Sequence, residues 1–106
     1  MTVVARLIAA LDRFPGVEQR PSRFAAHRPA WSIAGREFAH LHTDDVIDLR
    51  LSRAKQALLR GDPRARFRGS PSAWVELEFH SASDVAHVVA IAHDAWLEAK
   101  QQNQRG

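Results

Sequence analysis

The sequence contains no cysteine and no tyrosine, and its five glycines are dispersed along the chain. The missing cysteine excludes a disulfide framework, a thiol nucleophile, and zinc or iron–sulfur sites built from thiolates. The dispersed glycines exclude a glycine-rich loop of the kind that holds phosphates. Any chemistry must therefore come from histidine, carboxylate, arginine and aromatic side chains. The lack of cysteine also fits a cytoplasmic location, which we expect for this protein.

Long hydrophobic runs are also missing, although 45% of the 106 residues are hydrophobic. No apolar run approaches the roughly 18 residues that a membrane span needs. The segment from Met1 to Leu11 is not followed by a small-residue cleavage site, so we expect neither a signal peptide nor a membrane partner. Length and composition predict a single globular domain over residues 1–106.

Arginine supplies most of the positive charge, and the formal net charge is +3. Because neither tyrosine nor cysteine titrates, this small excess moves the isoelectric point to about 10.5. The charge is concentrated in residues 13–36 and in residues 60–68, where the nucleic-acid candidates are Arg60, Arg64, Arg66 and Arg68. Such stretches bind phosphates in some proteins. They also serve solubility, and both interpretations stay open.

The first thirty residues predict one helix and then an irregular segment. Thr2 is a suitable N-cap, and apolar residues from Val4 to Leu11 follow with the spacing of one helix face. Pro15 and the glycine after it end the helix. Residues 14–30 are rich in proline and arginine, and we expect a loop or an irregular edge segment there.

Three strands are expected in residues 31–51. Ala34–Gly35 is typical of a tight turn between the first two strands. Antiparallel partners share a face, so matching the apolar sets places Leu41 opposite Ile47. This register leaves a loop at residues 43–45. It also places four residues on the opposite face, pairing His40 with Asp48 and Phe38 with Arg50.

The second half predicts a short helix, two strands and a long final helix. Ser52 caps the short helix, which Gly61 closes. Residues 64–69 are a candidate strand, and residues 74–79 alternate as a strand should. Ser81–Asp84 is a capping sequence that begins the last helix, which we expect to run to about Gln102. The polar tail over residues 101–106 is expected to fray.

The predicted element order is α-β-β-β-α-β-β-α. Aliphatic residues line one face of the strands and need a cover, which the helices supply. The sequence therefore predicts an α+β fold with an antiparallel sheet covered on one face by helices. The apolar stripe of the last helix includes Trp96 and belongs either to the core or to a homodimer interface.

The uncovered sheet face is the candidate functional surface. Its amphipathic character suits a ligand with flat apolar and charged parts, or a protein partner. Cross-strand pairs of this kind also occur on ordinary solvated sheets. Trp31 lies in a hairpin whose register the sequence leaves ambiguous. The binding candidates are Phe38, His40, His42, Asp48, Arg50, Trp74 and Glu76, with Glu78 beside them.

His40 and His42 are two residues apart on one strand, with Asp48 across from them. Three such ligands could reach one divalent ion. Histidines at this spacing are common, however, and we expect neither a metal nor a cofactor. We expect Asp48 to orient His40. No catalytic residue can be assigned, and an enzyme that uses this histidine–aspartate pair stays open as an alternative.

From Gly16 to about Ala99 the chain resembles the luciferase family, a small bacterial and fungal domain of unknown function. The resemblance rests on short motifs, namely Pro21-x-Arg-Phe24, Arg36-Glu-Phe-Ala-His-Leu-His42, Asp45-x-Ile-Asp48, the helix at 52–60, Trp74-Val75 and Ser81-x-x-Asp84-Val85. The sequence has no site for luciferin oxidation, and we do not predict that activity. Members usually carry a histidine pair where this chain has Arg66-Phe67.

A weaker similarity links the chain to the YjbR-like proteins. It covers the helix ending in Gln56-Ala-Leu-Leu-Arg-Gly-Asp-Pro63 and the later Trp74-Val-Glu76. That family has a compact α+β fold proposed to bind DNA, which supports a nucleic-acid alternative. Taken together, the sequence favours a non-catalytic module that binds a small molecule or a protein through the open sheet face.

Overall fold

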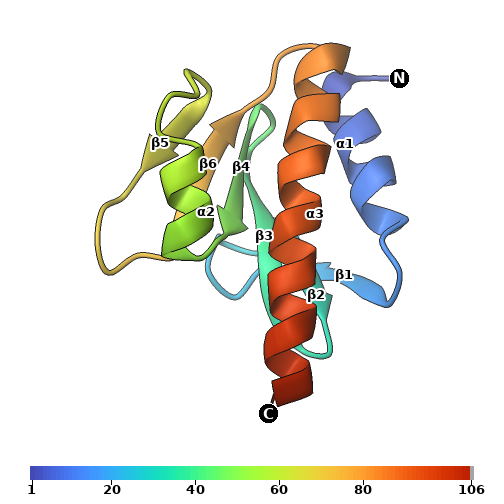
Figure 1. The fold of residues 1–106 in the computed structure, drawn as a ribbon. Helices are drawn as coiled ribbons and strands as arrows, with labels where there is room; N and C mark the ends of the chain where they lie inside the picture. Colours follow the sequence, from blue (N-terminus) through green and yellow to red (C-terminus); the bar gives the residue numbers. More distant parts are fainter. Residues whose placement is uncertain (106) are drawn as a thin grey trace.

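The computed structural model describes the backbone of residues 1–105 and the side chains of residues 1–102. Six strands form one antiparallel sheet in the order β1-β2-β3-β4-β6-β5 (Figure 1). The strands are β1 (Val17–Pro21), β2 (Pro29–Ile33), β3 (Arg36–Thr43), β4 (Val46–Arg50), β5 (Ala65–Phe67) and β6 (Trp74–Glu78).

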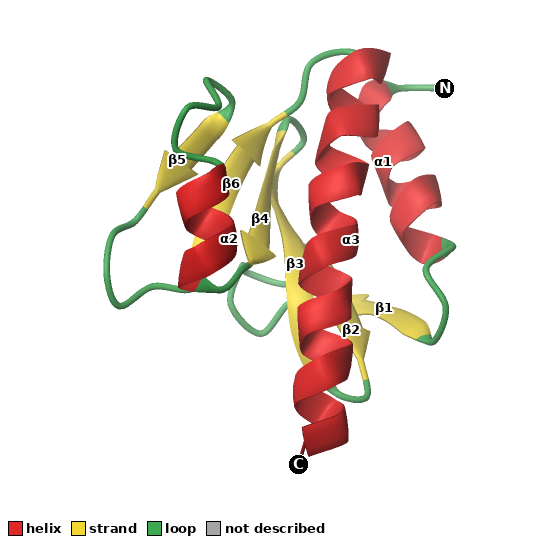
Figure 2. Cartoon of the chain, viewed as in Figure 1, coloured by secondary structure: helices red, strands yellow, loops and turns green. Residues whose placement is uncertain are grey.

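Three helices accompany the sheet: α1 (Val3–Asp12), α2 (Arg53–Leu58) and α3 (Ala82–Arg105). Helices α1 and α3 pack on each other and cover the same face of the sheet (Figure 2). The predicted caps are confirmed, because Thr2 accepts from the Ala5 N–H at 3.1 Å and Ser52 accepts from the Lys55 N–H at 3.3 Å. Helix α3 continues past Gln102 into the tail expected to fray. Gly106 lies outside the described residues.

The predicted α+β class is confirmed, with one more strand than the sequence indicated. Residues 17–21 form β1, within the segment 14–30 that was expected to be a loop or an irregular edge. β1 is an edge strand that exposes most of its side chains, so it needs no alternation of apolar residues. Pro21 is tolerated because an edge strand can lack one ladder donor.

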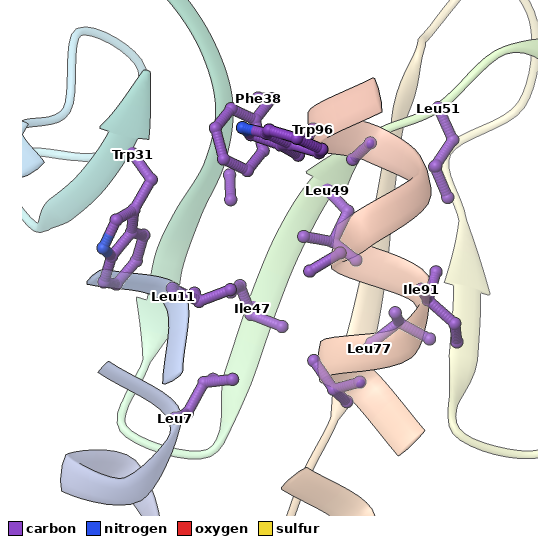
Figure 3. Close-up of a cluster of buried hydrophobic side chains, with 14 of the residues drawn as sticks. Leu7, Leu11, Trp31, Phe38, Ile47, Leu49, Leu51, Leu77, Ile91 and Trp96 are labelled. Atoms are coloured by element: carbon purple, nitrogen blue, oxygen red, sulfur yellow. The ribbon is translucent and has the colours of Figure 1, made fainter. Parts of the chain in front are cut away.

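The hydrophobic core lies between the sheet and helices α1 and α3 (Figure 3). Leu7 and Leu11 of α1 are fully buried there, as is Leu49 of β4. Trp96 of α3 belongs to this core, as one of the two open interpretations held. Its indole Nε1–H donates to the Pro15 carbonyl at 3.0 Å and ties α3 to the loop after α1.

The predicted register of β3 and β4 is confirmed, but the turn that joins the strands is different. Leu41 pairs with Ile47, and the next pair is Thr43 with Val46. His42 is therefore an extra residue in a bulge, and the turn has two residues instead of the predicted three-residue loop. The bulge changes the direction of the His42 side chain at the end of the strand.

A second bulge corrects the prediction for Phe38. Trp31 pairs with Ala39 while Ser32 pairs with Glu37, so Phe38 is the extra residue on β3. Phe38 was expected on the open face beside Arg50, but it is fully buried in the helix-covered core. Figure 3 shows it among the buried side chains of this core. Trp31, whose face the sequence left ambiguous, is in the same core.

Candidate functional site

The loop over residues 22–28 covers part of the sheet face that the helices leave free. Ser22 organises this loop, because its hydroxyl oxygen accepts from the Phe24 N–H at 2.9 Å and from the Ala25 N–H at 3.0 Å. The Ser22 N–H donates to the Arg28 carbonyl at 2.7 Å and closes the loop. The loop thereby carries Phe24 onto Trp74, with ring centres 5.4 Å apart.

His40 lies beneath this loop between two carboxylates. Its Nδ1 is 2.9 Å from a Glu37 oxygen, and its Nε2 is 2.7 Å from an Asp48 oxygen. All three side chains are buried, and Asp48 has no exposed surface. The same Glu37 oxygen accepts from the Ser22 hydroxyl at 2.9 Å. We call Ser22, Glu37, His40 and Asp48 the buried network.

The two contacts of His40 place a requirement on the hydrogen atoms of the buried network. A neutral imidazole has one N–H, so it can donate to one carboxylate only. Both contacts of His40 are hydrogen bonds when the ring carries two N–H groups, or when one carboxyl group is protonated. In either form, both ring nitrogens of His40 are occupied by Glu37 and Asp48.

Asp48 connects the buried network to two side chains at the surface. One of its oxygens, Oδ2, is 2.7 Å from His40 Nε2, accepts from an Arg68 terminal nitrogen at 3.3 Å, and lies 3.5 Å from His42 Nδ1. The other oxygen, Oδ1, is buried and has no donor among the side chains that the structure describes. Arg68 and His42 are both partly exposed and form the outer side of the site.

A hollow of about 580 Å³ lies over this part of the sheet. Phe24 and Trp74 give it apolar walls, and Asp48, His42 and Arg68 give it polar ones. Arg28 also lines it, and its buried Nε–H has no acceptor within the described part of the chain. Two residues that line the hollow, Asp48 and Arg28, thus each have a buried polar atom with no partner among the described side chains.

The other predicted binding residues lie around this hollow. Arg50 pairs with Trp74 across β4 and β6, and its guanidinium carbon is 4.8 Å from the centre of the indole ring. Glu76 pairs with Asp48, and its carboxylate is 3.5 Å from the Arg68 guanidinium. The structure thus brings together six of the seven predicted binding residues, and Phe38 alone lies on the other face.

Comparison with protein families adds a match to the model of the Luciferase domain over residues 35–95, which is more than half of the chain. The chain belongs to the Luciferase domain family. The match runs from the β2–β3 turn into α3 and includes Glu37, His40, Asp48 and Trp74, whereas Phe24 precedes it. No curated protein and no solved structure matches the chain.

Three functional residues of this Luciferase domain were missed from sequence. Strict alternation places Glu37 on the core face, and the bulge at Phe38 moves it beside His40. Two successive apolar residues, Phe38 and Ala39, within a strand were the available signal for the bulge. Phe24 belongs to the Pro21-x-Arg-Phe24 motif, but no local pattern placed it or Ser22 at the site, because a long-range hydrogen bond to Glu37 positions their loop.

Within residues 1–102, no three histidine or acidic side chains are placed to hold an ion together. The two ring nitrogens of His40 already contact Glu37 and Asp48.

No helix in the described chain is long and apolar enough to cross a membrane.

The nucleic-acid candidates of the Luciferase domain contact carboxylates, with one exception. Arg64 donates to Asp84 at 2.7 Å, and Arg66 contacts Glu78 at 3.0 Å. Arg68 contacts Asp48, as described above. Among the described side chains, Arg60 alone of the four has no ion pair. These pairs reduce the positive charge available to phosphates, so the nucleic-acid alternative stays a prediction that the contacts disfavour.

The Arg64–Asp84 pair predicts a loss of stability in acid. The His80 backbone N–H at 2.8 Å, followed by the Arg64 side chain, holds the pKa of Asp84 below its usual range. A lowered pKa in the folded protein stabilises it above the unfolded pKa of about 4, and this contribution is lost as the pH falls through the folded value. Asp84→Asn should therefore be less stable than wild type at pH about 7, with a gap that narrows toward pH about 3.

Urea unfolding at several pH values measures this gap. The variant and the wild type have the same charge at this position once Asp84 is protonated, so the pH dependence isolates the ionised carboxylate. A gap that keeps the same size from neutral pH to acid would contradict the assignment and would indicate a packing effect of the substitution.

Proposed function

We propose that this Luciferase domain is a non-catalytic module that binds a small molecule with a flat ring in the hollow beneath the 22–28 loop. The observation that supports the proposal is that the hollow has apolar walls and that two of its lining residues have polar atoms without a partner. Phe24 and Trp74 face the hollow with ring centres 5.4 Å apart. Aromatic walls with few polar groups are typical of ligand pockets.

The unpartnered polar atoms favour a ligand whose rim carries hydrogen-bonding groups. A buried carboxylate oxygen without a donor costs about 1–3 kcal/mol or more, and Asp48 Oδ1 has none among the described side chains. A ligand N–H or O–H that reaches this oxygen after a small movement of the loop removes that cost. Arg28 Nε offers the complementary donor to a ligand acceptor.

The occupancy of His40 supports binding over catalysis. A general base needs a free nitrogen within reach of the substrate proton, but both ring nitrogens of His40 contact carboxylates. The ring is also only 3% exposed. In this arrangement the buried network acts as a rigid floor that holds Asp48 in place. Within the buried network, no histidine nitrogen is free to act as the general base that the enzyme alternative needs.

Indole and benzofuran test the proposal as matched probes, because both are flat and indole alone has an N–H donor. In ligand-observed saturation-transfer NMR, we expect wild-type protein to transfer magnetisation to indole at millimolar concentration and less to benzofuran. Trp74→Ala should abolish the transfer, because the variant loses one aromatic wall. Phe67→Ala is the control, since it removes a partly exposed aromatic ring that does not line the hollow.

Phe24→Ala provides a second variant if Trp74→Ala does not fold. Phe24 is 58% exposed, so its removal should reduce indole binding without unfolding the protein. Indole that receives no transfer from the wild type would overturn the proposal. So would equal transfer from the wild type, Phe24→Ala and a folded Trp74→Ala variant.

A further inference from the structure

A second hollow, of about 620 Å³, is lined by arginines from three separate segments. Arg23 comes from the 22–28 loop, Arg36 begins β3, and Arg50 ends β4. Arg36 and Arg50 are half-buried. Burial, followed by the positive charge of Arg36, lowers the pKa of Arg50. Two like charges are thus held near each other where water screens them incompletely.

The three arginines form no ion pair with any described side chain. None of them has a carboxylate oxygen within 4.0 Å among the side chains that the structure describes, whereas Arg28 and Arg64 contact aspartates at 2.7 Å. Arg23 is exposed, whereas Arg36 and Arg50 are partly removed from water without a partner, which is unfavourable. An anion bound between the arginines would offset this cost.

Acidic side chains near the hollow are already engaged. Glu37 lines the hollow, but its oxygens accept from the Ser22 hydroxyl at 2.9 Å and from the Arg23 backbone N–H at 3.2 Å. One of these oxygens also contacts His40. Glu98 lies on the other side of Arg36 and Arg50, where it accepts from the Ser52 N–H at 2.9 Å. Three arginines against one engaged carboxylate leave this hollow positively charged.

Aromatic contacts fix the position of Arg50. Its guanidinium carbon is 4.8 Å from the centre of the Trp74 ring and 5.7 Å from that of Phe24. Stacking on ring faces restrains a guanidinium group and leaves its N–H groups in the plane available as donors. A restrained donor loses less entropy when it binds an anion.

We propose that Arg23, Arg36 and Arg50 form a binding site for a phosphate-type oxyanion, either free or as a phosphoryl group of a larger molecule. The planar guanidinium fork matches two oxygens of a tetrahedral oxyanion, and charge-assisted hydrogen bonds are the strongest of their class. The proposal does not assume that the aromatic hollow binds a ligand, because the two hollows have different polar groups, although Phe24 lines both and Trp74 of the aromatic hollow contacts Arg50.

Titration with inorganic phosphate at constant ionic strength, followed by NMR of arginine Nε–H and backbone amide signals, tests the site. We expect saturable shifts at Arg23, Arg36 and Arg50. Arg36→Gln should weaken binding at least about tenfold, because a hydrogen bond to a charged group contributes about 1.5–3 kcal/mol. Arg6→Gln is the matched control, since it removes the same charge from an exposed position on α1.

Phenyl phosphate distinguishes the two sources of the oxyanion. Equal affinity for inorganic and phenyl phosphate supports a site for the free ion, and tighter binding of phenyl phosphate supports a phosphoryl group attached to a flat ligand. Shifts that do not saturate, or equal weakening by Arg36→Gln and Arg6→Gln, would overturn the proposal in favour of diffuse surface charge. Indole and phosphate are tested separately on the wild-type protein, so binding of phosphate without indole would overturn only the first proposal, and binding of indole without phosphate only the second.

Discussion

An Asp48→Ala variant should unfold with a free energy at least about 1–3 kcal/mol below that of the wild type, because a buried polar group that loses its hydrogen-bond partner keeps the full cost of its removal from water. Asp48 has no exposed surface, and its carboxylate contacts His40 at 2.7 Å and Arg68 at 3.3 Å. Removing it leaves His40 buried with only Glu37 as a partner. Urea denaturation at neutral pH measures the loss.

Asp44→Ala is the matched control for this prediction. Asp44 is 80% exposed and pairs with Arg28 at the surface, where such pairs contribute about 0–1 kcal/mol. A double-mutant cycle of Asp48→Ala with His40→Ala should show that the two losses are not additive, since both variants break the same contact. Equal stability of Asp48→Ala and Asp44→Ala would show that the buried network does not stabilise the fold.

The buried network also shows which part of the site was predictable from sequence. Apolar residues occupy one face of both β3 and β4, so a register slip would expose them, and this fixed His40 opposite Asp48 in the prediction. Glu37 was not predictable by the same rule. The bulge at Phe38 places one extra residue between two paired positions of β3, and nothing in the composition of the strand indicates it. The residues before the bulge, including Glu37, therefore lie on the opposite face from the one that strict alternation predicts.

The cover over the site was not predictable for a different reason. Strand β1 is exposed and has no alternating pattern, and the 22–28 loop is positioned by the hydrogen bond from Ser22 to Glu37, 15 residues later. Local propensity contains no information about such a contact. The helices and most strands were predictable because their caps, turns and apolar spacing act over a few residues.

The burial of Phe38 in the helix-covered core predicts the second large loss of stability. Phe38→Ala should lower the free energy of unfolding by about 3–5 kcal/mol, the usual cost of truncating a buried phenylalanine. The ring is fully buried and lies 6.5 Å from the ring of Phe14. A residue on the open face, as strict alternation predicted, would lose far less.

Phe24→Ala supplies the comparison for Phe38→Ala under the same urea denaturation. Phe24 is 58% exposed, so its truncation should cost less than about 1 kcal/mol. The two variants remove the same atoms, and the difference between them therefore reports mainly the burial and packing of Phe38. Equal losses would mean that Phe38 is not in the core, and the bulge that places Glu37 beside His40 would then be wrong as well.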